Sequence, residues 1–178
     1  ISKSLGNVID PIEQKNKYGL SALRYYLFFG LNTFSDSKYS EENLISLWNS
    51  DVVNGLGNII ARTLHLVDIR NINVSGYEPD ELIKNHVANC IEEIESEFEK
   101  YNFNLVRLKL NAVLARLNKR FQDERPFEDK PQSPQIIKEI YYELTQIIPF
   151  YSIVLTDHKE QLEKAFKENK KVILFERK

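Results

Sequence analysis

The sequence contains no methionine at any of its 178 positions and begins at Ile1, so we expect it to be the C-terminal part of a longer chain. Its one cysteine, Cys90, cannot form an internal disulfide, which argues against a disulfide-stapled secreted scaffold and favours a cytoplasmic protein. No apolar run approaches the roughly 20 residues of a membrane helix, and the first residues lack the basic-then-apolar layout of a signal peptide. We therefore expect no membrane partner.

Neither sign of charge dominates the chain. Lysine and arginine together number 24 against 26 acidic residues, which gives a net charge of -2. Such a chain has no overall cationic field to attract nucleic acid, so any contact with RNA or phosphate must come from a local patch. The composition is otherwise that of a globular domain, with 42% hydrophobic and 28% charged residues.

Several kinds of reactive site are also missing. The sequence has no glycine-rich phosphate loop, no nucleophile elbow, and no paired cysteines or histidines at metal-ligand spacing. His65, His86 and His158 are dispersed, and we expect each on a helix surface. We therefore predict no metal site.

Helical periodicity is what the sequence does contain. Asp10 and Pro11 form a helix start, and Ser40 is placed to cap the longest helix. The expected helical ranges are 11–18, 21–31, 41–69, 82–98, 104–121, 136–148 and 159–168, with Pro149 ending or kinking the sixth. Three prolines mark 125–134 as a loop. With no convincing alternating strand, we predict an all-α helical bundle.

One motif stands at the N-terminus. It reads Ser2-Lys3-Ser4-Leu5-Gly6-Asn7-Val8-Ile9-Asp10-Pro11. This segment resembles the K-M-S-K-S loop of class I aminoacyl-tRNA synthetases, with isoleucine in place of the usual methionine. The resemblance implies an ATP-binding loop of Ser2, Lys3 and Ser4. Lys3 would be catalytic, because its ammonium would neutralise charge growing on the leaving pyrophosphate. Magnesium would arrive with the ATP.

Three further segments narrow the resemblance. They are residues 48–62, Pro126-Phe127 and Leu174-Phe175-Glu176-Arg177. They resemble the methionyl-tRNA synthetase family, which joins methionine to tRNA(Met) with ATP through methionyl-adenylate. The resemblance implies a signature loop and stem-contact segment in 1–36 and an anticodon-binding helical bundle in 37–178. The nucleotide-binding domain and the methionine pocket are absent from these residues, so the chain alone should be inactive.

Asn54, Asn58 and Arg62 form the candidate binding stripe. They recur every four residues, so on a helix they drift only about 40° per step and share a face. Amides can read the Watson-Crick edges of unpaired bases, and a guanidinium can stack on a base or bind phosphate. Gly55 and Gly57 flank Asn58, which suggests close approach of RNA or of another backbone. The alternative is an exposed face with a tight helix crossing.

Phe127 occupies the position at which the family has an anticodon-reading tryptophan. A phenyl ring keeps the stacking face, which contributes on the order of 1 to 3 kcal/mol per base, but lacks the indole N–H donor. The alternative is a place in the hydrophobic core.

Two other functions remain open at this point. The chain could belong to another class I synthetase, with isoleucyl and cysteinyl enzymes the nearest. It could also be a non-catalytic helical RNA-binding or scaffold module of synthetase ancestry, although Ser2-Lys3-Ser4 would then have no use. The oligomeric state is not predicted.

Overall fold

The computed structural model describes residues 9–169 and 174–178, and every regular element within these ranges is a helix. The α-helices are α1 (Pro11–Tyr18), α2 (Leu20–Tyr25), α3 (Glu41–Leu47), α4 (Asn58–Ile69), α5 (Glu81–Glu99), α6 (Phe103–Asp123), α7 (Ser133–Ser152) and α8 (Lys159–Glu168). Two π-helical segments, η2 (Tyr26–Gly30) and η3 (Trp48–Gly57), and a 3₁₀ turn, η4 (Thr156–His158), complete the chain order. The predicted all-α class is confirmed. Ser2, Lys3 and Ser4 lie outside the described residues.

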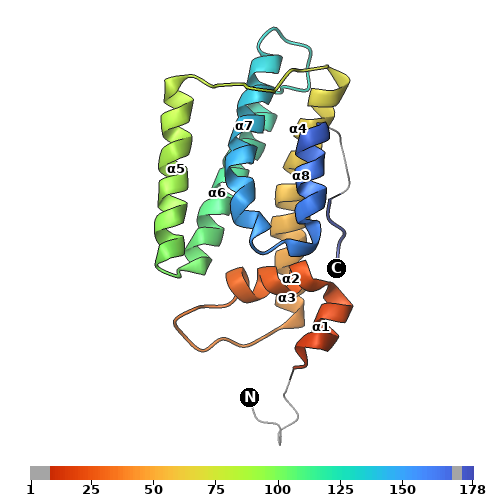
Figure 1. The fold of residues 1–178 in the computed structure, drawn as a ribbon, viewed down its shortest axis with the longest axis vertical. Coiled ribbons are helices and arrows are strands. Elements are labelled where there is room, and N and C mark those ends of the chain that lie inside the picture. The colour runs from red at the N-terminus through yellow and green to blue at the C-terminus, as the bar shows by residue number, and fades with distance from the viewer. Residues whose placement is uncertain (1–8, 170–173) are drawn as a thin grey trace, which may run out of the picture.

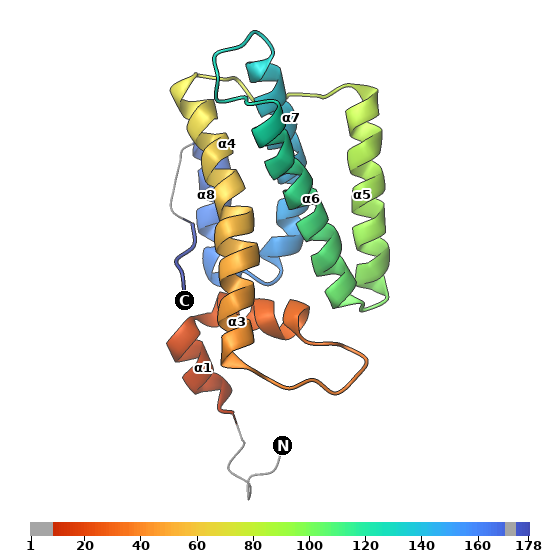
Figure 2. The same ribbon diagram turned by 180° about the vertical axis from the view of Figure 1, so that it is seen from behind.

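Four long helices form the body of the molecule. In Figure 1, α4, α5, α6 and α7 run along the long axis with α8 beside α7, and α1 and α2 lie at one end, where α3 continues the line of α4. The connections 70–80 and 124–132 lie at the opposite end, and the view from behind in Figure 2 agrees. We call this second end the loop end. Within the described ranges, no helix has both the length and the apolarity to cross a membrane.

The longest helix runs without a break from Glu41 to Ile69, as the sequence predicts. The Ser40 side chain accepts a hydrogen bond from the backbone N–H of Asn43 at 3.2 Å, so the predicted N-cap is confirmed. The middle ten residues, η3, were not predicted as π-helix. In such a segment the backbone bonds span five residues instead of four, which widens the helix and changes its angular period.

Three sequence expectations differ from the structure. α6 begins at Phe103, so Asn104 lies inside the helix and does not cap it. Pro149 neither ends nor interrupts α7, which continues to Ser152 because the buried Tyr151 anchors its last turn in the core. His158 is half-buried instead of lying on the surface. Its ring lies 5.8 Å from Trp48 and 5.1 Å from Phe175, and burial lowers its pKa.

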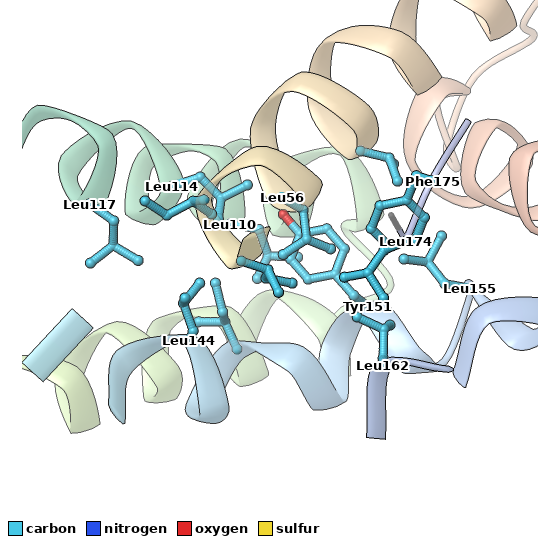
Figure 3. Close-up of a cluster of buried hydrophobic side chains, with 14 of the residues drawn as sticks. Leu56, Leu110, Leu114, Leu117, Leu144, Tyr151, Leu155, Leu162, Leu174 and Phe175 are labelled. Atoms are coloured by element: carbon cyan, nitrogen blue, oxygen red, sulfur yellow. The ribbon is translucent and has the colours of Figure 1, made fainter. Parts of the chain in front are cut away.

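The core joins the long helix to α6, α7, α8 and the C-terminal segment 174–178. Figure 3 shows side chains from all of these elements converging on one cluster. The residues labelled there are Leu56, Leu110, Leu114, Leu117, Leu144, Tyr151, Leu155, Leu162, Leu174 and Phe175, and all are buried. Trp48 ties the C-terminal segment in place, because its indole N–H donates to the carbonyl oxygen of Glu176 at 2.8 Å. The long helix is therefore held on several sides, and its exposed face is fixed in orientation.

Candidate nucleic-acid interface

The three residues of the candidate binding stripe lie on two kinds of helix. Asn54 belongs to the π-helical segment η3, Asn58 is the first residue of α4, and Arg62 follows one turn later. Asn54 and Asn58 are exposed, whereas Arg62 is half-buried. Asn58 and Arg62 are therefore related by one regular α-helical turn, whereas Asn54 and Asn58 are separated by a π-helical segment with a different angular period.

The Arg62 guanidinium is held in place by α6. Its central carbon lies 4.2 Å from the ring centroid of the buried Phe121, a cation–π arrangement. Its Nη1 also donates to Oδ1 of Asn118 at 3.5 Å. Burial lowers the pKa of Arg62, but a guanidinium stays protonated in proteins. No carboxylate among residues 9–169 and 174–178 lies within 4.0 Å of it, so this oriented cation has no anionic partner there.

The two asparagines differ in availability. Nη2 of Arg177 donates to Oδ1 of Asn54 at 3.0 Å, so the C-terminal segment already occupies the Asn54 acceptor. The side chain of Asn58 makes no hydrogen bond to another described residue. Asn58 is therefore exposed and without a described hydrogen-bond partner, whereas Asn54 is exposed but already accepts one hydrogen bond from Arg177.

The glycines beside Asn58 are explained by side-chain packing. A Cβ on Gly57 would come within 2.9 Å of Cδ2 of Phe175, and one on Gly55 would lie 3.5 Å from Cδ1 of Leu114. These neighbours are side chains of the C-terminal segment and of α6. The tight crossing considered as the alternative is thus what these positions show, and neither glycine approaches a second backbone segment.

Phe127 lies at the loop end, between α6 and α7. Its side chain is 47% exposed, so a place in the hydrophobic core is wrong. The guanidinium carbon of Arg125 lies 5.6 Å from its ring centroid. Glu128 pairs with both Arg125 and Lys130 at 2.6 Å, which closes the loop on itself. The ring is consequently an exposed aromatic surface on an ordered turn.

Arg70, at the C-terminal end of α4, is a site residue that the sequence did not indicate. Its Nη1 donates to the carbonyl oxygen of Pro126 at 2.9 Å, and its Nη2 donates to that of Phe127 at 2.7 Å. The same helix that carries Asn58 and Arg62 thus also holds the turn that carries Phe127. No local pattern reveals this contact, because the partners are 56 and 57 residues apart.

A groove of about 480 Å³ lies between α7 and α8, away from these residues. Residues that include Ile148, Pro149 and Phe166 line it, whereas Arg62 and Phe127 do not. Among the described residues, no group of three or more His, Cys, Asp or Glu side chains is placed to hold a metal ion.

Comparison with known proteins gives the family. The model of the tRNA synthetases class I (M) family matches residues 1–64. A methionine–tRNA ligase of Ureaplasma parvum is 35% identical over 163 residues, which cover 88% of this chain and 31% of that protein. The chain belongs to the methionyl-tRNA synthetase family. This confirms the predicted family over the isoleucyl and cysteinyl alternatives.

Other methionyl-tRNA synthetases extend the match. The methionine–tRNA ligase of Caldanaerobacter subterraneus is 29% identical over 164 residues, 88% of this chain and 26% of that protein. The methionyl-tRNA synthetase structure of Mycobacterium tuberculosis in complex with methionyl-adenylate superposes with a TM-score of 0.75 at 20% identity, covering 92% of this chain and 35% of that one. That likeness shows the shared fold. The chain spans about a quarter to a third of the length of these relatives.

Proposed function

We propose that this chain is the C-terminal, anticodon-binding part of a methionyl-tRNA synthetase that works in the cytoplasm. The complete enzyme would join methionine to tRNA(Met) with ATP through methionyl-adenylate. Residues 1–36 would form the signature loop and stem-contact segment, and residues 37–178 the anticodon-binding bundle. Family membership at 35% identity to a methionine–tRNA ligase supports this assignment.

The proposed catalytic contribution of this chain is confined to its first residues. Lys3, with Ser2 and Ser4, would contact the triphosphate of ATP, whose magnesium would come with the nucleotide. The lysine ammonium would stabilise the negative charge that develops on pyrophosphate as it leaves. The amino-acid pocket and the rest of the nucleotide site would lie in the parts of the enzyme that this chain does not span.

The observation that carries the proposal is that Asn58 and Arg62 lie on successive turns of α4. Asn58 offers free amide donors and acceptors, and Arg62 offers a guanidinium with no carboxylate partner among the described residues. An unpaired base can be read on its edge by the amide and bound through its ring or phosphate by the guanidinium. Phe127 adds an exposed ring on which a second base could stack.

The proposal can be tested by binding to an anticodon stem-loop. The affinity of the 178-residue chain would be measured, at about physiological salt, for a stem-loop with the anticodon CAU and for one with a single anticodon base changed. We expect a preference for CAU of tenfold or more, about 1.4 kcal/mol, and we expect Arg62→Ala to abolish it.

Lys119→Ala provides the matched control for charge. Lys119 is exposed on α6 beside Asn118, and it forms no ion pair with a described residue. Its loss should weaken binding to both stem-loops equally, because a contact to phosphate carries no base information. Equal affinity of the unaltered chain for both stem-loops would contradict the proposal.

A further inference from the structure

The end of α4 is a Schellman motif that fixes the backbone at Arg70. The N–H of Ile72 donates to the carbonyl oxygen of Val67 at 3.0 Å, and the N–H of Asn71 donates to that of Asp68 at 3.1 Å. Asn71 has a φ of 48°, the left-handed conformation that asparagine tolerates better than most residues. Val67 and Ile72 are both buried. The Arg70 side chain therefore extends from a backbone position that is fixed by these hydrogen bonds.

From this position Arg70 binds two consecutive peptide units of the turn. Its two terminal nitrogens bind the carbonyl oxygens of Pro126 and Phe127, which are consecutive in the chain. Two donors on one planar guanidinium constrain both the position and the orientation of the short backbone segment that carries the two carbonyls. A lysine ammonium has no such fork, so it could not hold both carbonyls in the same way.

The rest of the turn is braced from the α7 side. The N–H of Glu128 donates to the carbonyl oxygen of Arg125 at 3.0 Å, and Oγ of Ser133 donates to the carbonyl oxygen of Glu128 at 2.8 Å. Arg125 itself has a φ of 49°, which turns the chain sharply before Pro126. These bonds shape the turn internally, whereas the two from Arg70 are what join it to α4.

We infer that Arg70 is a positioning residue for RNA recognition, which sets the Phe127 ring relative to Asn58 and Arg62 so that a second unpaired base can stack on it. This inference rests on the proposed function. The rise of an α-helix is 1.5 Å per residue, so Arg62 and Arg70 are separated by about 12 Å along α4. That spacing suits a reader of adjacent bases in one loop, since Asn58 and Arg62 lie on α4 and Arg70, at the end of the same helix, holds the turn that carries Phe127.

The test is a double-mutant cycle between Arg70 and Phe127. Affinity for the CAU stem-loop, and for one with a single anticodon base changed, would be measured for Arg70→Ala, Arg70→Lys, Phe127→Ala and the double variant Arg70→Ala/Phe127→Ala. Amide hydrogen exchange of residues 127–130 would be measured without RNA. Lys138→Ala removes one positive charge near the same end, where its ammonium lies 5.7 Å from the Tyr77 ring, and serves as the control.

We expect Arg70→Ala to weaken CAU binding about as much as Phe127→Ala, tenfold or more, and the double variant to be no weaker than either single one. Arg70→Lys should restore the charge without restoring affinity. Exchange of the turn amides should accelerate in both Arg70 variants. The Lys138→Ala variant should lose only a little affinity, equally for CAU and changed stem-loops, with unchanged exchange in the turn.

The outcomes separate this inference from the proposed function. CAU discrimination that survives Arg70→Ala but not Phe127→Ala would overturn the role of Arg70 and leave the function standing. If the fold-losses of affinity of the two single variants multiply in the double variant, the positioning role of Arg70 would also be overturned. Such independent losses would indicate direct contact between Arg70 and RNA. If the unaltered chain does not discriminate, the proposed function fails, and unchanged exchange in Arg70→Ala would separately reject the positioning of the turn.

Discussion

Glu41 shows how one carboxylate joins the N-terminal helices. Its oxygens accept hydrogen bonds from Gln14 at 3.0 Å, Lys17 at 2.5 Å and Tyr18 at 2.6 Å, so the first turn of α3 is tied to α1. The bonds to Lys17, Tyr18 and Gln14 lower the pKa of Glu41 to about 2. Donors that favour the charged form are the cause of this shift.

This lowered pKa predicts a specific pH dependence of stability. A carboxyl that binds protons more weakly in the folded than in the unfolded state stabilises the fold above its unfolded pKa, near 4.5, and loses that contribution as the pH falls toward 2. Urea unfolding at several pH values should therefore show that Glu41→Gln lowers the free energy of unfolding at pH 6 but much less at pH 2.

Glu42→Gln is the control for this experiment, because the neighbouring Glu42 side chain makes no hydrogen bond or ion pair with a described residue. Its pH profile should follow that of the unaltered chain. The Glu41 effect should also shrink in salt, since its side chain is 41% exposed. A Glu41→Gln penalty that persists undiminished at pH 2 would show that the carboxylate charge is not what matters.

Local patterns predicted the elements well. Ser40 and Asp10 cap their helices through side-chain oxygens, as local chemistry requires. The apolar periodicity gave the ends of the long helix, and Lys159–Glu168 is helical as predicted. These features depend on residues within a few positions of one another, which is why the sequence reveals them.

Contacts between distant segments explain what the sequence did not predict. Arg70 holds the turn at Phe127, and Arg177 donates a hydrogen bond to Asn54, across separations of 57 and 123 residues. Such pairs exist only after the helices have packed, and no local spacing encodes them. The candidate site therefore includes a partner for Asn54 and a turn at the loop end, neither of which the four-residue spacing indicated.

Gly57 gives a prediction at the scale of the long helix. Alanine is about 1 kcal/mol more favourable than glycine inside a helix, but its Cβ would lie 2.9 Å from the Phe175 ring. That ring is confined by Trp48 at 5.9 Å and by His158. We expect Gly57→Ala to displace the C-terminal segment and to lower the free energy of unfolding by about 1 to 3 kcal/mol.

Trp48 is the only tryptophan, so its fluorescence reports on this displacement directly. Emission should shift to longer wavelength in Gly57→Ala as the indole loses Phe175 and the Glu176 carbonyl. Gly55→Ala is the matched control: its Cβ would lie 3.3 Å from the Ser50 carbonyl oxygen and away from the C-terminal segment, so emission should not change. Identical spectra for both variants would refute the packing role of Gly57.

Across the molecule, the neighbouring helices α5 and α6 differ in charge. α5 carries six glutamates and one lysine, and only Val87 and Ile94 along it are buried, so most of its surface faces solvent. α6 carries five basic residues and one aspartate, although several of these cations are paired with carboxylates. An approaching RNA would be repelled by α5 and would meet the α4 and α6 side, where Arg62 and Lys119 lack carboxylate partners among the described residues.

The central claim is that α4 and the turn it holds read an anticodon, and site-directed cross-linking tests it most directly. A CAU stem-loop would carry 4-thiouridine as its anticodon uridine, and the peptides joined to it after irradiation would be identified by mass spectrometry. We expect cross-links in 58–70 or 124–132, at a yield that falls when another anticodon base is changed. Cross-links on α5, or a yield that ignores the anticodon sequence, would contradict it.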